Sequence, residues 1–193
     1  MRALVRRPTA RLLLLVTFLR IVLVPVVVVL VLAGARSGHA FVAAAVVFAV
    51  AASTDFLDGY LARRWSVTST LGSFLDTTAD KLLVSGALIA LVDVHRVNAW
   101  IAFVIIGREL VILGLRGVAA ATGTIVEPSI WGKLKANVQF LGIFLAMLRY
   151  PHALGPLFLD EWVMVTAAAV TVISGIEYLM RFSSLLASSD GGG

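Results

Sequence analysis

Six long apolar segments alternate with short polar stretches along the chain, and charged residues gather toward one end of each segment. The segments cover residues 12–33, 40–60, 72–93, 98–117, 133–149 and 161–181. A helix needs about 20 apolar residues to cross a hydrocarbon core that is about 30 Å thick. Only helices and closed barrels satisfy their backbone hydrogen bonds in lipid. The pattern therefore predicts an all-α integral membrane bundle of six transmembrane helices.

Lysines and arginines are distributed unequally between the two sides of this predicted bundle. If the N-terminus is inside, 13 of the 16 lie in the cytoplasmic half, and the other three are Arg36, Arg96 and Arg149. Basic residues favour the cytoplasmic side, so both termini are predicted to be cytoplasmic in a multi-pass protein of the cell (inner, cytoplasmic) membrane. The first eleven residues contain four arginines and have two interpretations: a basic topogenic tail or a short amphipathic surface helix.

Composition supports a membrane protein and excludes several other classes. Hydrophobic residues make up 60% of the 193 residues and charged residues 14%, which is unlike a soluble domain. The net charge of +5 suits anionic lipid surfaces. Nucleic-acid binding is less well supported, because the sequence has no dense stripe of basic residues. The chain has no cysteine, so disulfides and thiolate chemistry are excluded. Residues 1–185 are predicted to form a single polytopic domain, followed by a polar disordered tail at 186–193.

Four of the eleven acidic residues lie between positions 55 and 80, in the stretch DFLDGYLARRWSVTSTLGSFLDTTAD. Asp55 and Asp58 are spaced i,i+3, and Asp76 and Asp80 are spaced i,i+4, so each pair shares one helical face. Four neighbouring anions repel one another and are costly to desolvate, which implies bound cations. Hard oxygen ligands favour Mg²⁺ or Mn²⁺ over zinc, and four carboxylates suit two such ions better than one. An alternative treats these aspartates as helix caps or as partners of nearby basic residues.

Polar residues in five segments are predicted to share one depth in the membrane. Counting inward from the predicted outer ends at ~1.5 Å per residue places one polar group of each segment at about 20 Å. These groups are Arg20, Asp55, Asp80, Lys135 and Glu177. The level is roughly 10 Å inside the cytoplasmic boundary of a core about 30 Å thick. This shared depth predicts a single buried site that opens toward the cytoplasm.

The pattern D-x2-D-G-x2-A-R-x8-G-x3-D-x3-D resembles the signature of the CDP-alcohol phosphotransferase family at every specified position. The resemblance implies a homodimeric membrane enzyme of phospholipid biosynthesis that transfers a phosphatidyl or similar group from a CDP-linked lipid to an alcohol and releases CMP. It implies that the four aspartates hold two divalent ions and that Asp80 is also the general base. The residues that it implies for the CDP-lipid site are Arg20, Gly59, Ala62, Arg63, Ser69 and Gly72.

The second half of the chain resembles the phosphatidylglycerophosphate synthase branch of that family. The resemblance lies in GRELVILGLRGVAAATG (107–123) and SIWGKLKANVQF (129–140), with Ala136 where the branch usually has Thr. Near the N-terminus, Leu13 and Leu14 replace the usual Pro-Asn pair, although Thr17, Arg20 and Pro25 match. The branch implies transfer from CDP-diacylglycerol to glycerol 3-phosphate. Cardiolipin or phosphatidylinositol phosphate synthesis remain alternatives within the family.

Four basic residues near the level of the aspartates are candidates for binding an anionic acceptor. We call them the acceptor cations: Arg108, Arg116, Lys133 and Lys135. Cations beside apolar runs are costly without a partner, and the phosphate of glycerol 3-phosphate would provide one. The alternatives are a purely topogenic role or pairing with Glu109 and Glu177. A membrane cation transporter is a hypothesis of another class, but it would place polar groups on both sides of the midplane and show repeats. Here every strongly placed acid is predicted on the cytoplasmic side, and the sequence shows no repeat.

Overall fold

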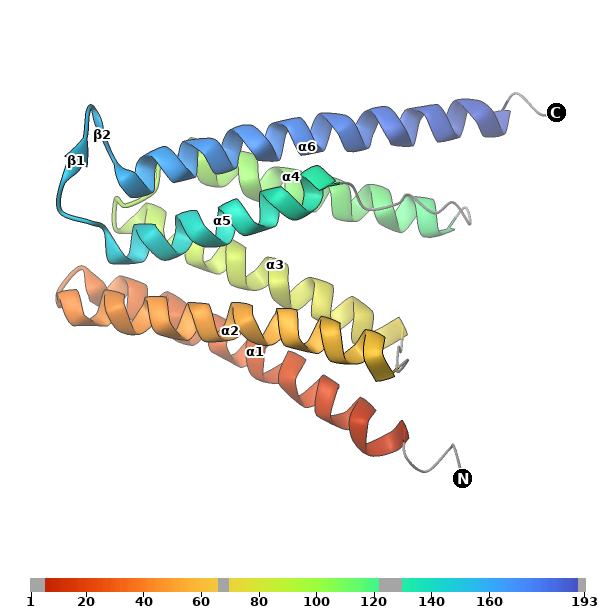
Figure 1. Ribbon diagram of the computed structural model, residues 1–193, viewed down its shortest axis with the longest axis horizontal. Coiled ribbons are helices and arrows are strands. Elements are labelled where there is room, and N and C mark those ends of the chain that lie inside the picture. The colour runs from red at the N-terminus through yellow and green to blue at the C-terminus, as the bar shows by residue number, and fades with distance from the viewer. Residues whose placement is uncertain (1–5, 66–69, 122–129, 191–193) are drawn as a thin grey trace. The chain divides into compact units, whose positions relative to one another are not determined.

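A computed structural model describes the backbone over residues 6–65, 70–121 and 130–190, and the side chains over 15–54, 75–120 and 130–183. Each predicted apolar segment forms one helix within these ranges (Figure 1). The helices are α1 (Arg6–Gly34), α2 (Gly38–Trp65), α3 (Thr70–Asp93), α4 (Ala99–Ala121), α5 (Ile130–Leu148) and α6 (Leu159–Asp190). The prediction of an all-α fold is confirmed in the described residues, apart from a small hairpin between α5 and α6.

Two helical stretches of the described chain are long and apolar enough to cross a membrane, Leu15–Gly34 in α1 and Leu159–Ser183 in α6. A shorter apolar stretch, Gly38–Thr54, forms the first part of α2. In α3, α4 and α5, charged and polar residues interrupt the apolar sequence. These interruptions include Asp76, Asp80 and Lys135, which the sequence had marked as candidate site residues.

The chain divides into two compact units. The first consists of Met1–Arg96 together with Ala146–Leu148. In this unit α1 packs along both α2 and α3 (Figure 1). Small residues such as Ala44, Ala51 and Ala87 are completely or almost completely buried, and they allow the helix backbones to approach closely. Gly86 lies against α1, where an added Cβ would be 3.0 Å from Val24.

The second unit consists of Val97–Leu145 and Arg149–Gly193, and α4 packs against α6 within it. Gly142 of α5 faces α6 so closely that an added Cβ would be 2.6 Å from the Met164 sulfur. The hairpin pairs β1 (Ala153–Leu154) with β2 (Leu157–Phe158) in antiparallel register. Gly155 has φ +72° in the turn between them, a conformation that side chains rarely adopt. The hairpin carries the chain from the end of α5 to the start of α6.

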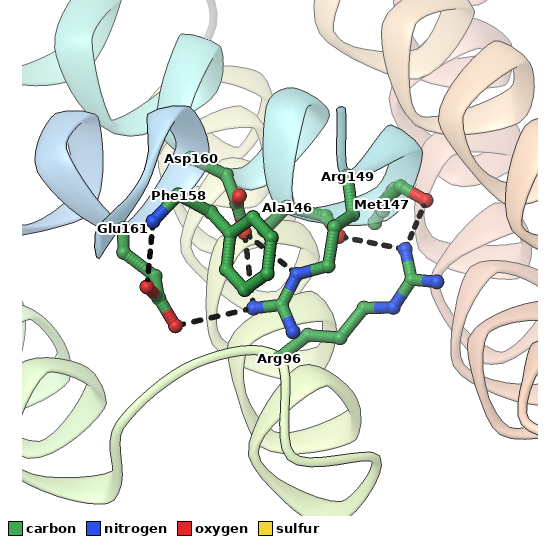
Figure 2. A network of polar contacts seen from close by, with 7 residues as sticks. All are labelled: Arg96, Ala146, Met147, Arg149, Phe158, Asp160 and Glu161. Atoms are coloured by element: carbon green, nitrogen blue, oxygen red, sulfur yellow. Dashed lines mark hydrogen bonds and ion pairs between the residues drawn. The ribbon is translucent and has the colours of Figure 1, made fainter. Parts of the chain in front are cut away.

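Arg96, one of the three basic residues predicted on the outer side, has a structural role in the first unit. Its Nη1 donates to the carbonyl oxygens of Ala146 (3.1 Å) and Met147 (2.7 Å), as Figure 2 shows. These carbonyls belong to the last turn of α5, which has no helical partners for them. The guanidinium carbon also lies 3.5 Å from the centroid of the Phe41 ring, a cation–π contact. Arg96 therefore caps a helix, which accounts for a cation at this end of the molecule.

Arg149 has a comparable role in the second unit. Its Nη2 lies 3.2 Å from Asp160 Oδ2 and 3.5 Å from Glu161 Oε1 (Figure 2). Both acids belong to the first turn of α6, where negative side chains complement the helix dipole. The guanidinium carbon is also 5.0 Å from the centroid of the Phe158 ring. Arg149 thus joins the end of α5 to the start of α6.

The first and last helices extend beyond the apolar segments marked in the sequence. α1 begins at Arg6 and continues into the apolar span, so residues 6–11 are its first turns and not a separate surface helix. Pro8 lies in that first turn, where a helix tolerates proline. α6 continues to Asp190 and therefore includes residues 186–190 of the predicted tail. The reason is that no helix breaker precedes the terminal glycines. Residues 1–5, 66–69, 122–129 and 191–193 lie outside the described chain.

Candidate active site

A buried arginine on α1 joins all three helices of the first unit. Arg20 is 1% exposed. Its Nε donates to the Ala51 carbonyl of α2 at 3.2 Å, and its Nη1 donates to Asp76 Oδ1 of α3 at 2.8 Å. A buried charge is tolerated only when it is paired and hydrogen-bonded. Arg20 therefore fixes α2 and α3 against α1 at the level where the aspartates begin.

The α2 aspartates follow directly after this anchor. The Ala51 carbonyl also accepts a hydrogen bond from Thr54 Oγ1 at 2.7 Å, and Asp55 is one turn further along the helix. α2 remains helical through Trp65, so the i,i+3 spacing of Asp55 and Asp58 places both on one face. Five predicted site residues belong to this part of α2, but their side chains lie outside the described part of the structure: Asp55, Asp58, Gly59, Ala62 and Arg63.

On α3 the structure describes two of the four aspartates. Asp76 and Asp80 are one turn apart and are both partly buried, and the Asp76 side chain is 37% exposed. Asp80 also makes further interactions within the chain. Gly72 lies one turn earlier on the same helix, whereas Ser69 lies outside the described residues. Among the side chains that the structure describes, no group of three or more acids, histidines or cysteines gathers in one place. The four-carboxylate set therefore remains a prediction.

In the second unit a layer of buried polar contacts connects the three helices. One contact joins each pair of helices: α4 to α5, α5 to α6, and α4 to α6. They are Lys135 Nζ to Glu109 Oε1, Gln139 Nε2 to Thr171 Oγ1 (2.7 Å), and Arg108 Nη2 to Ser174 Oγ (2.8 Å). A buried polar network that is hydrogen-bonded in this way fixes the helices in one arrangement.

Glu109 brings two of the acceptor cations together. Its Oε1 accepts from Lys135 and lies 3.5 Å from Arg108 Nη1. Pairing with Glu109, one of the alternatives considered for the acceptor cations, is therefore observed for these two residues. Arg116 and Lys133 are exposed, and Glu177 pairs with Arg181 at 2.6 Å.

Sequence reasoning missed the contribution of α6 to this layer. Thr171 and Ser174 are 0% and 1% exposed in a helix that is otherwise apolar here. Together with Tyr178 they have the spacing i, i+3, i+7, which marks one helical face. That spacing was visible in the sequence, and three polar residues on one face of an apolar helix indicate a polar layer.

The arrangement defines a helical protein in which a buried arginine holds an aspartate-rich pair of helices, with a basic, hydrogen-bonded layer in its second unit. Comparison with protein families identifies the family of this chain. The model of the CDP-alcohol phosphatidyltransferases matches residues 14–173, so the chain belongs to this family. The family predicted from the aspartate pattern is thereby confirmed.

Three bacterial relatives of this chain carry the same name. The chain is 36% identical over 186 residues to the CDP-diacylglycerol–glycerol-3-phosphate 3-phosphatidyltransferase of Bacillus subtilis, covering 91% of this chain and 96% of that protein. The protein of the same name from Pseudomonas fluorescens is 37% identical over 172 residues, 86% of each chain. That of Haemophilus influenzae is 38% identical over 138 residues, 69% of this chain and 73% of its own.

Proposed function

We propose that this chain transfers the phosphatidyl group from CDP-diacylglycerol to glycerol 3-phosphate, giving phosphatidylglycerophosphate and CMP. The family match and the names of the relatives support this reaction. The structural observation that carries it is the bridge from Arg20 to Asp76 and to the α2 turn before Asp55. A buried cation at this position holds together the two helices that bear the family's aspartates.

We further propose that Asp55, Asp58, Asp76 and Asp80 hold two Mg²⁺ or Mn²⁺ ions. The residues fit such ions because the donors are all carboxylate oxygens, which these hard cations prefer. Asp76 and Asp80 also share one face of α3 and are partly open to solvent. Divalent ions bound there would neutralise the diphosphate and the charge on departing CMP.

The role proposed for Asp80 is that of general base. The acceptor hydroxyl oxygen forms a bond to the β-phosphorus of the CDP-lipid, and the bond from that phosphorus to the bridging oxygen breaks. CMP leaves with that oxygen, and the hydroxyl proton passes to the Asp80 carboxylate. Helical spacing places Asp80 one turn from Asp76, which Arg20 holds in position. A base positioned in this way can take the proton as the new bond to phosphorus forms.

The acceptor cations are proposed to bind the phosphate of glycerol 3-phosphate. The clustering of Arg108 and Lys135 around Glu109 supports this role, because neighbouring cations attract an anionic ligand. The CDP-lipid is proposed to contact Arg20, Gly59, Ala62, Arg63, Ser69 and Gly72. Within this proposal Arg20 acts at least partly through Asp76, to which it is bonded.

The membrane arrangement is proposed as six spans in the cell membrane, with both termini and the active site toward the cytoplasm. The two long apolar helices and the membership of a membrane enzyme family support it. The polar interruptions in α3, α4 and α5 are then site residues that are shielded within the protein. A homodimer is proposed from the family resemblance.

An acceptor screen tests the proposed reaction. Purified protein, CDP-diacylglycerol and Mg²⁺ or Mn²⁺ are combined with glycerol 3-phosphate, inositol phosphate or phosphatidylglycerol, and CMP release is measured. CMP should appear with glycerol 3-phosphate and should require the metal. Release with inositol phosphate or phosphatidylglycerol instead would assign the chain to another branch of the family. Glycerol serves as the control, because it has the hydroxyl groups but no phosphate.

A further inference from the structure

The side chain of Arg108 crosses a glycine on the neighbouring helix. A Cβ added at Gly175 of α6 would lie 3.3 Å from Arg108 Cγ and 4.0 Å from its Nε. Ser174, the residue before this glycine, accepts a hydrogen bond from Arg108 Nη2 at 2.8 Å. Both α6 residues are buried. The position of the arginine side chain therefore depends on the lack of a Cβ at Gly175 and on the hydroxyl group of Ser174.

This position leaves the Nε donor of the guanidinium group without a hydrogen-bond partner within the ranges that the structure describes. Nη1 faces Glu109 and Nη2 is bonded to Ser174, but Nε is buried without a hydrogen-bond partner among the described residues. The hydroxyl of Tyr178, one turn after Ser174, is likewise buried without a partner in the described part of the chain. Buried donors are rarely left unpaired in a native structure, and each such group needs an explanation.

We propose that Ser174 and Gly175 are positioning residues that hold Arg108 so that its Nε, together with the Tyr178 hydroxyl, binds an oxygen of the anionic alcohol acceptor. This inference rests on the proposed function, because it assigns these donors to the same acceptor. A phosphate oxygen bound to Nε would gain a charge-assisted hydrogen bond. It would also satisfy the donors that the protein leaves open. α6 then contributes to recognition of the acceptor, a role that neither the family's aspartate motif nor the acceptor cations include.

Gly175→Ala is the sharpest test, because the added methyl group acts on the path of Arg108 and leaves its charge in place. We expect the KM for glycerol 3-phosphate to rise about tenfold, which corresponds to the loss of one charge-assisted hydrogen bond. The KM for CDP-diacylglycerol should stay within about twofold, since the donors concerned face the acceptor. Gly114→Ala is the matched control, because nothing lies within 4 Å of a Cβ at that position.

Two further variants separate positioning from folding. Ser174→Ala should raise the same KM, and Ser174→Thr, which keeps the hydroxyl group, should restore it. Tyr178→Phe removes one oxygen and should raise the KM for the acceptor alone. If Gly175→Ala and Ser174→Ala leave this KM unchanged, or raise both KM values together while the melting temperature falls, the positioning role is wrong.

A binding measurement distinguishes failure of this inference from failure of the proposed function. Inorganic phosphate is titrated into the purified protein, with the Gly175→Ala and Gly114→Ala variants alongside. If phosphate binds and Gly175→Ala alone weakens it, while the unmodified chain makes no CMP with glycerol 3-phosphate, the positioning role stands and the acceptor assignment falls. If the unmodified chain uses glycerol 3-phosphate and Gly175→Ala alters neither phosphate binding nor the KM, the proposed function stands and the positioning role falls.

Discussion

Arg20 Nη1 on α1 donates a hydrogen bond of 2.8 Å to Asp76 Oδ1 on α3. The arginine side chain is completely buried, whereas that of Asp76 is 37% exposed. The pair therefore has a buried end that anchors it and an end that is partly open to solvent. Removing one partner of such a pair strongly destabilises the protein, because the other charge is left without compensation. The bond explains how an aspartate is held in place within the helices of the first unit.

The first prediction concerns this anchor. Arg20→Lys keeps the charge, but one ammonium group cannot reproduce the planar fork that reaches both Asp76 and the Ala51 carbonyl. We expect kcat/KM for CMP release to fall about 10- to 100-fold, because a hydrogen bond to a charged group contributes about 1.5–3 kcal/mol. The same substitution at Arg36, which is exposed after α1, is the control. Equal activity of the two variants would show that Arg20 does not organise the site.

The second prediction concerns the proposed base. Asp80→Asn keeps the size of the side chain but removes both the negative charge and the ability to accept a proton. CMP release should therefore be abolished, while binding of CDP-diacylglycerol, measured by equilibrium titration, should persist. Asp93→Asn at the other end of α3 is the control, because Asp93 is exposed there. A different result would contradict the assignment of Asp80 as base: weaker binding of CDP-diacylglycerol, together with a normal rate of CMP release from the lipid that does bind.

The sequence predicted the six helices well, because they follow a periodic pattern of apolar residues. Counting residues along the helices predicted one depth for Arg20 and Asp80. In the structure Arg20 forms an ion pair with Asp76, which is one helical turn from Asp80. Helix rise is nearly constant, so such counting stays accurate over a single span. The four aspartates were identified because their spacing follows the helical repeat.

Contacts between segments distant in the sequence were less predictable. Lys135 was assigned to an acceptor, but the structure pairs it with Glu109, and charge alone cannot decide between these partners. The bond from Arg108 to Ser174 depends on Gly175, and a glycine in an apolar helix has many explanations. The hairpin between α5 and α6 was missed because strands of two residues are too short for a periodic signal.

A third prediction addresses the acceptor cations. Lys135→Ala should raise the KM for glycerol 3-phosphate more than the KM for CDP-diacylglycerol, because the ammonium group is proposed to bind the acceptor phosphate. Glu109→Gln should have the opposite effect on the acceptor KM, since it frees Lys135 and Arg108 from their shared carboxylate. Leu134→Ala, at an exposed position beside Lys135, is the control. A larger effect of Lys135→Ala on the KM for CDP-diacylglycerol would place the lysine at the lipid instead.

A fourth prediction concerns stability at the opposite end of the first unit. A Cβ at Gly34 would lie 2.5 Å from Phe41 Cδ1, far inside contact distance. Phe41 cannot move aside freely, because its ring is buried and packs against the Arg96 guanidinium group. Gly34→Ala should therefore lower the free energy of unfolding by about 1–3 kcal/mol, the usual result of overpacking. The higher helix propensity of alanine offsets this by at most about 1 kcal/mol.

Thermal unfolding of the purified protein in detergent measures the effect of Gly34→Ala, and Gly38→Ala is the matched control because nothing lies within 4 Å of a Cβ there. The control should unfold at the temperature of the unmodified chain or slightly above it. Adding Phe41→Leu to Gly34→Ala should recover part of the loss, since the smaller side chain relieves the clash and residues in contact are not additive. If the double variant is less stable than the sum of the two single changes predicts, the contact between Gly34 and Phe41 is not the cause. CMP release at low temperature should be unchanged in Gly34→Ala, because this contact anchors α5 through Arg96 and not the aspartates through Arg20.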